Sequence, residues 1–122
     1  MIDIKCMDSS AWLAYYFAGS IEAKEVVEGE FTLITSILSL FEIKKRLLTL
    51  HKNPQELLDF IKQRSGLIVP NMEIVEKAAV LAIEKKLAAM DALLYTTSVL
   101  HDAEFITGDN DFRGLERVRI IS

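Results

Sequence analysis

The sequence contains little of what disulfide scaffolds, zinc sites and membrane proteins need. Its 122 residues include one cysteine, Cys6, and two histidines. A single cysteine excludes a disulfide within the chain and a cysteine-rich zinc knuckle. No apolar run reaches the length of about 18 residues that a membrane span needs, and Asp3 and Lys5 interrupt the stretch where a signal peptide has its apolar centre. We therefore expect a cytoplasmic protein with no membrane anchor.

The charge balance is mildly acidic. A net charge of −4, from 14 Lys and Arg against 18 Asp and Glu, provides no bulk basic field to attract nucleic acid or an anionic membrane. A nucleic-acid substrate is still possible, because acids gathered at a metal site add negative charge that bound cations cancel. Hydrophobic residues make up 51% of the chain, which is typical of a parallel sheet covered on both faces.

Strand-like segments alternate with helix-like segments along the chain. Short apolar or β-rich stretches predict strands at 2–7, 30–34, 66–69, 103–107 and 117–121. Capped, amphipathic segments lie between most of them. The alternation predicts one three-layer α/β/α domain over residues 1–122, with a central, mainly parallel sheet.

Two of the intervening helices carry further expectations. The helix that opens at Thr35 or Ser36 has apolar residues spread widely around it, so we expect most of its surface to be buried. Asn53 and Pro54 provide a cap and a first-turn proline for the next helix. Charges separate the apolar residues of that helix, and we expect it to form part of a surface hairpin.

Acidic residues follow two strands of the predicted sheet. Asp8 comes directly after the first strand, and Asp109, with Asp111 behind it, follows the fourth strand after one glycine. Ligand sites of open parallel sheets form outside the carboxyl ends of the strands, where the strand order reverses. If these two strands are neighbours, their carboxylates converge. Asp91, the lone acid of an apolar helix, and Glu42, in an earlier apolar helix, are candidates to join them.

Such a cluster has a characteristic chemistry. Asp and Glu without nearby His or Cys select a hard divalent cation, Mg²⁺ or Mn²⁺, over zinc or copper. A site of this kind suits phosphodiester hydrolysis. Crowded carboxylates repel one another, so at least one is expected to have a raised pKa without metal. His51 and His101 lie at predicted helix ends, where we expect solvent-facing or capping roles, and Cys6 is expected to pack within its strand.

Each acid also has a purely structural explanation. Asp8 can cap a helix, and Asp91 can be a first-turn acid favoured by the helix dipole. The segment 108–111 can be an ordinary Gly/Asn/Asp turn. An EF-hand beginning in this turn is excluded, because Arg113 fills a ligand position and Ile120 stands where the bidentate glutamate belongs. The metal-site hypothesis therefore rests on the set of acids and on no single member.

Four features taken together resemble the PIN-domain family. They are D-S-S after the first strand, a glutamate in an early apolar helix, M-D-A-L-L at the start of a late helix, and the segment F-I-T-G-D-N-D-F. The resemblance covers essentially the whole chain, whose small size is similar to that of the VapC-like toxins. It implies a metal-dependent endoribonuclease with an acidic pocket for Mg²⁺ or Mn²⁺, here the toxin of a type II toxin–antitoxin system.

The resemblance also implies roles for individual acids. Asp8, Glu42, Asp91 and Asp109 match the four core acids of the family in chain order, and Asp111 matches an auxiliary acid. Metal ligation is implied for the four aspartates, with Glu42 bridging toward the metal. RNA hydrolysis at such a site is expected to leave 3′-hydroxyl and 5′-phosphate ends.

Polar and basic residues near these acids complete the implied site. Ser10 and Thr107 match hydroxyl residues beside the first and fourth acids, and Ser10 is expected to lie next to the metal. No basic motif for RNA stands out. The nearest basic candidates for phosphate contacts are Lys44, Lys45, Arg46 and Arg113.

The resemblance further implies a homodimer and a VapB-like antitoxin whose tail covers the acidic cleft. Two alternatives stay open. One is an RNA-processing PIN nuclease outside any toxin–antitoxin pair, and the other is a non-catalytic PIN-like module that binds a protein or RNA. A neighbouring gene for a small DNA-binding antitoxin would favour the toxin, whereas loss of metal-dependent cleavage in Asp8→Asn or Asp91→Asn would separate an enzyme from a binding module.

Overall fold

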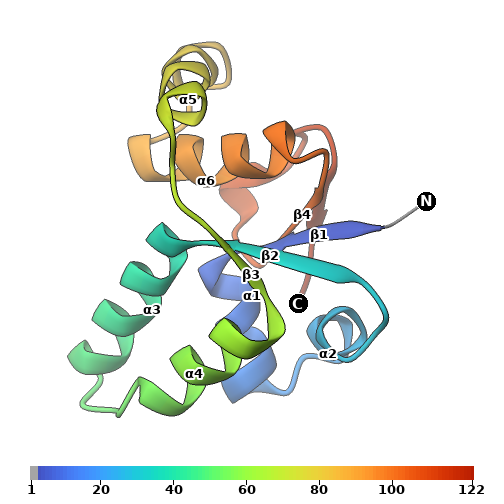
Figure 1. Ribbon diagram of the computed structural model, residues 1–122, viewed down its shortest axis with the longest axis vertical. Helices are drawn as coiled ribbons and strands as arrows, with labels where there is room; N and C mark the ends of the chain where they lie inside the picture. Colours follow the sequence, from blue (N-terminus) through green and yellow to red (C-terminus); the bar gives the residue numbers. More distant parts are fainter. Residues whose placement is uncertain (1–2) are drawn as a thin grey trace.

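A computed structural model describes residues 3–122, so Ile2, the predicted start of the first strand, lies outside the described residues (Figure 1). Within them, five strands form one all-parallel sheet in the order β3-β2-β1-β4-β5. The strands are β1 Ile4–Met7, β2 Thr32–Ser36, β3 Gly66–Ile68, β4 Glu104–Thr107 and β5 Val118–Ile120. The predicted α/β fold is confirmed, and its sheet is wholly parallel.

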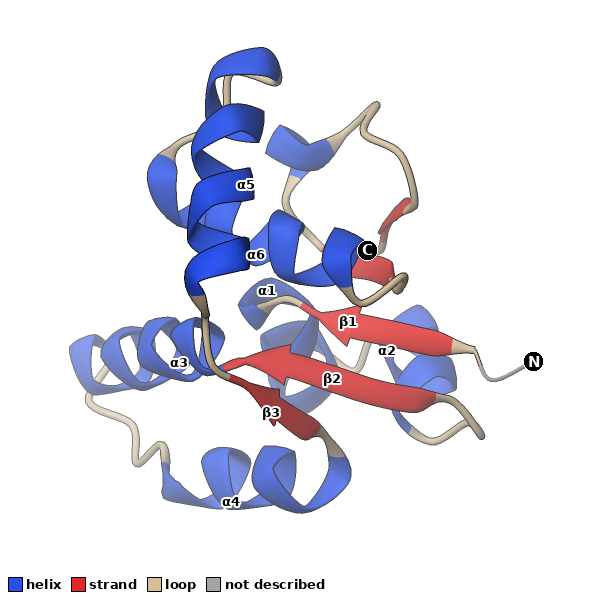
Figure 2. Ribbon diagram, turned by 45° about the horizontal axis from the view of Figure 1, so that its top comes forward, coloured by secondary structure: helices blue, strands red, loops and turns tan. Residues whose placement is uncertain are grey.

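Six α-helices in residues 3–122 cover the two faces of this sheet (Figures 1 and 2). They are α1 Ser9–Leu13, α2 Ile21–Val27, α3 Ile37–Thr49, α4 Gln55–Arg64, α5 Met72–Glu84 and α6 Ala89–Leu100. A π-helical turn, Ala14–Ala18, extends α1, and a 3₁₀ turn, Asn110–Phe112, follows β4. The core beneath α1–α4 is separate from the core beneath α5 and α6. None of the helices in this part of the chain is both long and apolar enough to cross a membrane.

The strands contribute side chains to both cores. In β1, Met7 packs in the core beneath α1–α4, and Cys6 packs in the core beneath α5 and α6. In β4, Ile106 and Phe105 divide in the same way, because successive strand residues point to opposite faces. The prediction that Cys6 is a packing residue is confirmed. Burial, the largest cause, raises the pKa of its thiol to about 12.

Local sequence signals set the helix boundaries on the first half of the sheet. Asp8, Ser20 and Ser36 are the N-caps of α1, α2 and α3, and each side chain accepts a hydrogen bond from a backbone N–H of the first turn. Gly19 ends the π-helical turn with φ 62°, a left-handed conformation that glycine adopts without strain. The caps at Asp8 and Ser36 agree with the sequence-based expectations.

The strand order reverses between β1 and β4. The chain builds β1, β2 and β3 outward in one direction and then returns to place β4 on the free side of β1. In the register of this pair, Met7 lies beside Ile106, and the Asp8 N–H donates to the Ile106 carbonyl at 2.9 Å. The prediction that the first and fourth strands are neighbours is confirmed. Asp8 and the turn after Thr107 therefore leave the sheet side by side at its carboxyl edge.

The expectation that most of the surface of α3 is buried is wrong. The helix α3 buries one face only, through residues such as Ile43, while Phe41 and Leu48 are 58% and 54% exposed. The helix contacts α1, α4, α6 and β2 with one side, and nothing in residues 3–122 covers the exposed residues of its other side. The helix α4 packs an apolar face, with Leu57 and Ile61, into the core and exposes most of its charged residues, in agreement with the predicted alternation of apolar and charged residues.

The one-sided burial of α3 leads to a stability prediction. Ile43→Ala should lower the free energy of unfolding by about 2–5 kcal/mol, because it opens a cavity in a closed core. Leu48→Ala, on the same helix, should change it by less than about 0.5 kcal/mol, because the side chain is more than half exposed. Urea unfolding followed by circular dichroism measures both. Equal losses in the two variants would contradict the one-sided packing of α3.

Candidate metal centre

Asp8 is the most deeply buried acid of the site, with 4% of its surface exposed. Its Oδ1 accepts from the Ser9 N–H at 2.8 Å, and its Oδ2 accepts from the hydroxyls of Ser10 at 3.0 Å and Thr107 at 2.7 Å. Burial raises the pKa of the carboxyl, the three donors oppose that rise, and the charge of Asp109 adds to it. Asp8 therefore caps α1 and also belongs to an acidic cluster, so the two explanations do not exclude each other.

Two hydroxyl groups connect Asp8 to the turn after β4. The Ser10 Oγ accepts from the Gly108 N–H at 2.8 Å, and the Thr107 Oγ1 accepts from the Asp109 N–H at 3.0 Å. The two hydroxyl oxygens are 3.2 Å apart. The same side chains that solvate the Asp8 carboxylate thus fix the backbone from which Asp109 projects.

Three carboxylates converge beside this network. Asp91, Asp109 and Asp111 each offer an oxygen, and these oxygens lie within 4.8 Å of one another. Asp91 comes from the first turn of α6, and Asp109 caps the 3₁₀ turn by accepting from the Asp111 N–H at 2.9 Å. Burial is the largest cause that raises the pKa of Asp91, followed by repulsion from Asp109 and then Asp8. Residues of the turn after β4 are thus also residues of the acidic cluster.

Glu42 lies at the edge of the cluster on α3. It is partly buried, and its Oε1 accepts from the Ser9 hydroxyl at 3.1 Å. Burial raises the pKa of its carboxyl, and the charges of Asp8, Asp91 and Asp109 raise it further. Ser9 was not singled out as a site residue from the sequence. Its place in D-S-S next to the first acid is the signal that could have identified it.

The cluster has an excess of negative charge. The prediction of at least one raised pKa is confirmed at Asp8, Glu42 and Asp91, each with burial as the first cause. Within residues 3–122, no Lys or Arg side chain forms an ion pair with any of the five predicted acids. The donor set consists of carboxylate oxygens, which are the ligands that Mg²⁺ and Mn²⁺ prefer. These residues therefore fit a hard divalent cation.

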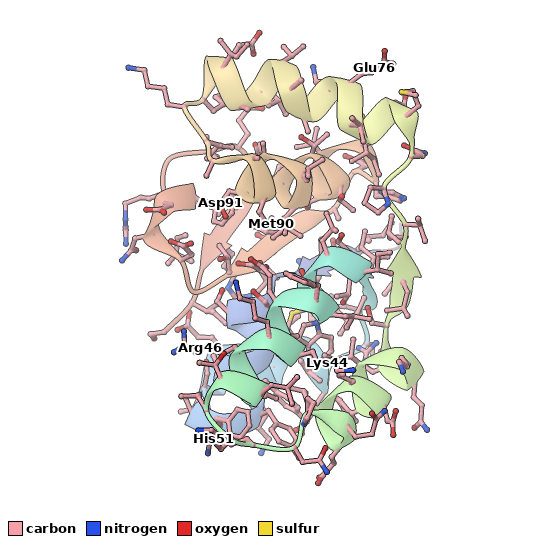
Figure 3. The ribbon with its side chains drawn as sticks, turned by 90° about the vertical axis from the view of Figure 1, so that its left-hand side faces the viewer. Lys44, Arg46, His51, Glu76, Met90 and Asp91 are labelled. Carbon is pink, nitrogen blue, oxygen red and sulfur yellow. The ribbon has the colours of Figure 1, made fainter. Side chains whose placement is uncertain are left out.

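The predicted basic residues are distributed unevenly around the acids. Arg113 donates to the Asn110 side chain at 2.6 Å. Figure 3 shows Arg46 on the side of α3 that faces Asp91 and Lys44 on another side of this helix. The basic residues on α3 are therefore not equivalent candidates for contacts near the acids.

The histidines have the expected structural roles. His101 caps the C-terminus of α6, with its Nδ1 2.8 Å from the Thr97 carbonyl oxygen. His51 follows α3 in an exposed position. Neither belongs to the three-acid group.

An all-parallel sheet with an acidic cluster where its strand order reverses defines an α/β protein with a candidate divalent-metal site. The family model of the PIN domain matches residues 5–118. The chain therefore belongs to the PIN-domain family. A search of curated proteins found no match.

Solved structures of toxin–antitoxin proteins are similar to this chain over nearly its whole length. A chain of a toxin–antitoxin complex from Klebsiella pneumoniae is 25% identical, with a TM-score of 0.79 and coverage of 94% of this chain and 95% of that one. A chain of VapBC2 from Rickettsia felis, solved with a promoter DNA fragment, is 14% identical, with a TM-score of 0.80 and coverage of 98% and 99%. VapC20 of Mycobacterium tuberculosis, a sarcin–ricin loop cleaving toxin, is 17% identical, with a TM-score of 0.76 and coverage of 97% and 99%.

The raised pKa of Asp91 leads to a prediction for metal-free protein. Its folded pKa lies above the ordinary value of 3.8, so above that pH the folded state binds more protons than the unfolded chain. The free energy of unfolding then falls as pH rises. Because Asp91→Asn removes this contribution, the variant should gain stability relative to wild type between about pH 4 and pH 7 in EDTA.

Urea unfolding at several pH values measures this difference, which cancels the contributions of groups that do not interact with Asp91. The loss of the Asp91 charge also relieves Glu42, which changes the difference in the same direction. Asp59→Asn, which removes an exposed acid of α4, is the matched control. Its free energy of unfolding should not increase relative to wild type as the pH rises. A constant difference between Asp91→Asn and wild type would contradict the electrostatic description of the cluster.

The hydroxyl network predicts a second pH-dependent effect. Thr107→Val keeps the shape of a fully buried side chain but removes one donor to Asp8 and the acceptor of the Asp109 N–H. We expect a loss of about 1–3 kcal/mol in the free energy of unfolding, larger at neutral pH, where the Asp8 carboxylate needs the donor most. Thr107→Ser retains the hydroxyl and is the control. An equal loss in the free energy of unfolding for both variants at every pH would show that these hydrogen bonds do not stabilise the protein.

Proposed function

We propose that this chain is a metal-dependent endoribonuclease, the VapC-like toxin of a type II toxin–antitoxin system. The observation that carries the proposal is the convergence of Asp91, Asp109 and Asp111 beside the buried Asp8, at the edge where β1 and β4 end. Membership of the PIN-domain family and similarity to VapC toxins support it.

The acids have distinct parts in this proposal. Asp91, Asp109 and Asp111 would hold Mg²⁺ or Mn²⁺, and Asp8 and Glu42 would add negative charge and further oxygen ligands from β1 and α3. When bound, such a cation would activate a water molecule and neutralise the charge that develops on the scissile phosphate.

Serine and threonine residues around the acids hold the carboxylates in place. Ser10 and Thr107 orient the Asp8 carboxylate through their hydroxyls and hold the turn that bears Asp109. Ser9 orients Glu42. The carboxyls of Glu42 and Asp91 have raised pKa values, first because of burial and then because of neighbouring acids, so a cation bound there would compete with protons.

We also propose the partners implied by the family resemblance, namely an RNA substrate, a second copy of the chain and a VapB-like antitoxin. The similar chain from Klebsiella pneumoniae belongs to a toxin–antitoxin complex, and the one from Rickettsia felis belongs to VapBC2. Exposed apolar side chains such as Met72, Ile83 and Leu48 provide surface that protein partners can cover. The cytoplasmic location stays a prediction.

The proposal predicts metal-dependent RNA cleavage that requires the clustered acids. Purified protein should cut a pool of structured RNAs at discrete sites with Mn²⁺ or Mg²⁺ and not with EDTA. Asp91→Asn should lower the rate at least about 100-fold, because changes outside the first ligand shell already cost 10- to 100-fold. Asp59→Asn, at an exposed acid on α4, should cut at the wild-type rate.

Metal binding provides a readout that does not depend on finding the right RNA. Mn²⁺ should raise the midpoint of thermal unfolding of the wild type and of Asp59→Asn, and much less that of Asp91→Asn. A stabilised wild type that cuts no RNA would favour the non-catalytic PIN-like module. If Mn²⁺ stabilises neither wild type nor variant, the proposed metal centre is wrong.

A further inference from the structure

A groove of about 460 Å³ opens beside the acidic cluster, between α1 and α3. Three of its lining residues connect it to the site: Ser10 hydrogen-bonds Asp8, Glu42 accepts from Ser9, and Met90 directly precedes Asp91. The groove therefore begins at the place where the scissile phosphate would lie.

The groove continues away from the acids into a second hollow of about 290 Å³. The two hollows share Leu13 and Arg46 as lining residues. The outer one ends at Phe17 and Lys52, whose ammonium nitrogen lies 5.0 Å from the centre of the Phe17 ring. Together they form one track, here called the α1–α3 groove.

The charge of this groove is opposite to that of the acidic cluster and of the whole chain. Lys45, Arg46 and Lys52 line it, and Glu42, at the inner end, is the one acid among its lining residues in the described chain. Within residues 3–122, none of these three cations forms an ion pair. On a protein of net charge −4, an unpaired basic track that leads to a metal-binding pocket is complementary to a polyanion that is cut there.

An aromatic side chain lies among these cations. Phe41 is 58% exposed and lines the inner hollow. Lys45 follows it by four residues, so the ring and the ammonium group are neighbours on the helix surface. Arg46 follows Glu42 by four residues, so its Cα lies about 6 Å further along the helix axis. An aromatic platform alternating with cations is the arrangement that binds unpaired nucleotides.

We propose that the α1–α3 groove binds an unpaired RNA strand next to the cleaved phosphate. A base stacks on Phe41, and Lys45 and Arg46 contact the adjoining phosphates. This inference rests on the proposed ribonuclease function and adds the location and single-stranded character of the bound segment. Figure 3 shows Arg46 on the side of α3 toward Asp91, as a strand leaving the acids along this helix requires, and Lys44 on another side.

The test compares matched variants on one helix. Binding of a fluorescein-labelled, unstructured RNA 12-mer is measured by anisotropy in Ca²⁺, at several salt concentrations. Lys45→Ala and Arg46→Ala should each reduce the slope of log affinity against log salt by about 0.7, the value for one phosphate contact on a single strand. Lys44→Ala, at an exposed lysine outside the groove, should leave the slope unchanged.

The aromatic contact has a different signature. Phe41→Ala should weaken binding about 5- to 100-fold without changing the salt slope, because stacking involves no phosphate charge. Leu48→Ala removes a similarly exposed apolar side chain from another side of α3 and should bind as wild type does. An identical loss in the two variants would overturn the stacking role.

Cleavage by the same variants with Mn²⁺ separates the two proposals. Wild-type cleavage with equal RNA affinity in all variants overturns the groove and leaves the ribonuclease standing. Affinities and slopes that change as expected, without any cleavage by wild type, support the groove and overturn the ribonuclease. If Lys45→Ala and Arg46→Ala bind RNA normally but fail to bind an antitoxin-type peptide, the groove is a protein-binding site and the RNA assignment is wrong.

Discussion

The Asp8 carboxylate, buried where β1 and β4 end, is the constraint on which the rest of the site depends. A carboxylate with so little contact with water needs donors, and it receives them from Ser9, Ser10 and Thr107. Thr107 is available only because β4 lies beside β1, so the sheet order supplies the solvation of the acid. The hydrogen bonds that hold Asp8 also hold the turn bearing Asp109, and fold and site are therefore stabilised by the same contacts.

The remaining acids make this edge of the sheet electrostatically unfavourable without a cation. Burial and mutual repulsion raise the pKa values of Asp8, Glu42 and Asp91, and no cationic side chain of residues 3–122 offsets them with an ion pair. A folded domain tolerates such a cost when the rest of the structure fixes the groups in place, as the cap of α1, the first turn of α6 and the 3₁₀ turn do here. Unfavourable electrostatic interactions of this kind are typical of functional sites.

The parts of this structure that local chemistry determines were predictable from the sequence. Apolar strands, the caps at Asp8 and Ser36 and acids at strand ends follow from residue type and spacing. The exposure of Phe41 was not predictable, because it depends on which elements cover α3 after the chain has folded. The Ser9 to Glu42 hydrogen bond joins residues 33 positions apart and likewise requires the packing of α1 on α3.

The helix α3 also shows that the net charge of the chain does not describe its local surfaces. Its helical period separates an apolar face around Ile43, an acid at Glu42 that belongs to the cluster, and the cations Lys45 and Arg46 that line the groove. Summed over the chain, these charges cancel into a mildly acidic total. A metal at the acids would remove much of the negative charge and leave the basic groove as the main local field. Whether a metal occupies the site would then decide whether the surface that meets a substrate is negatively or positively charged.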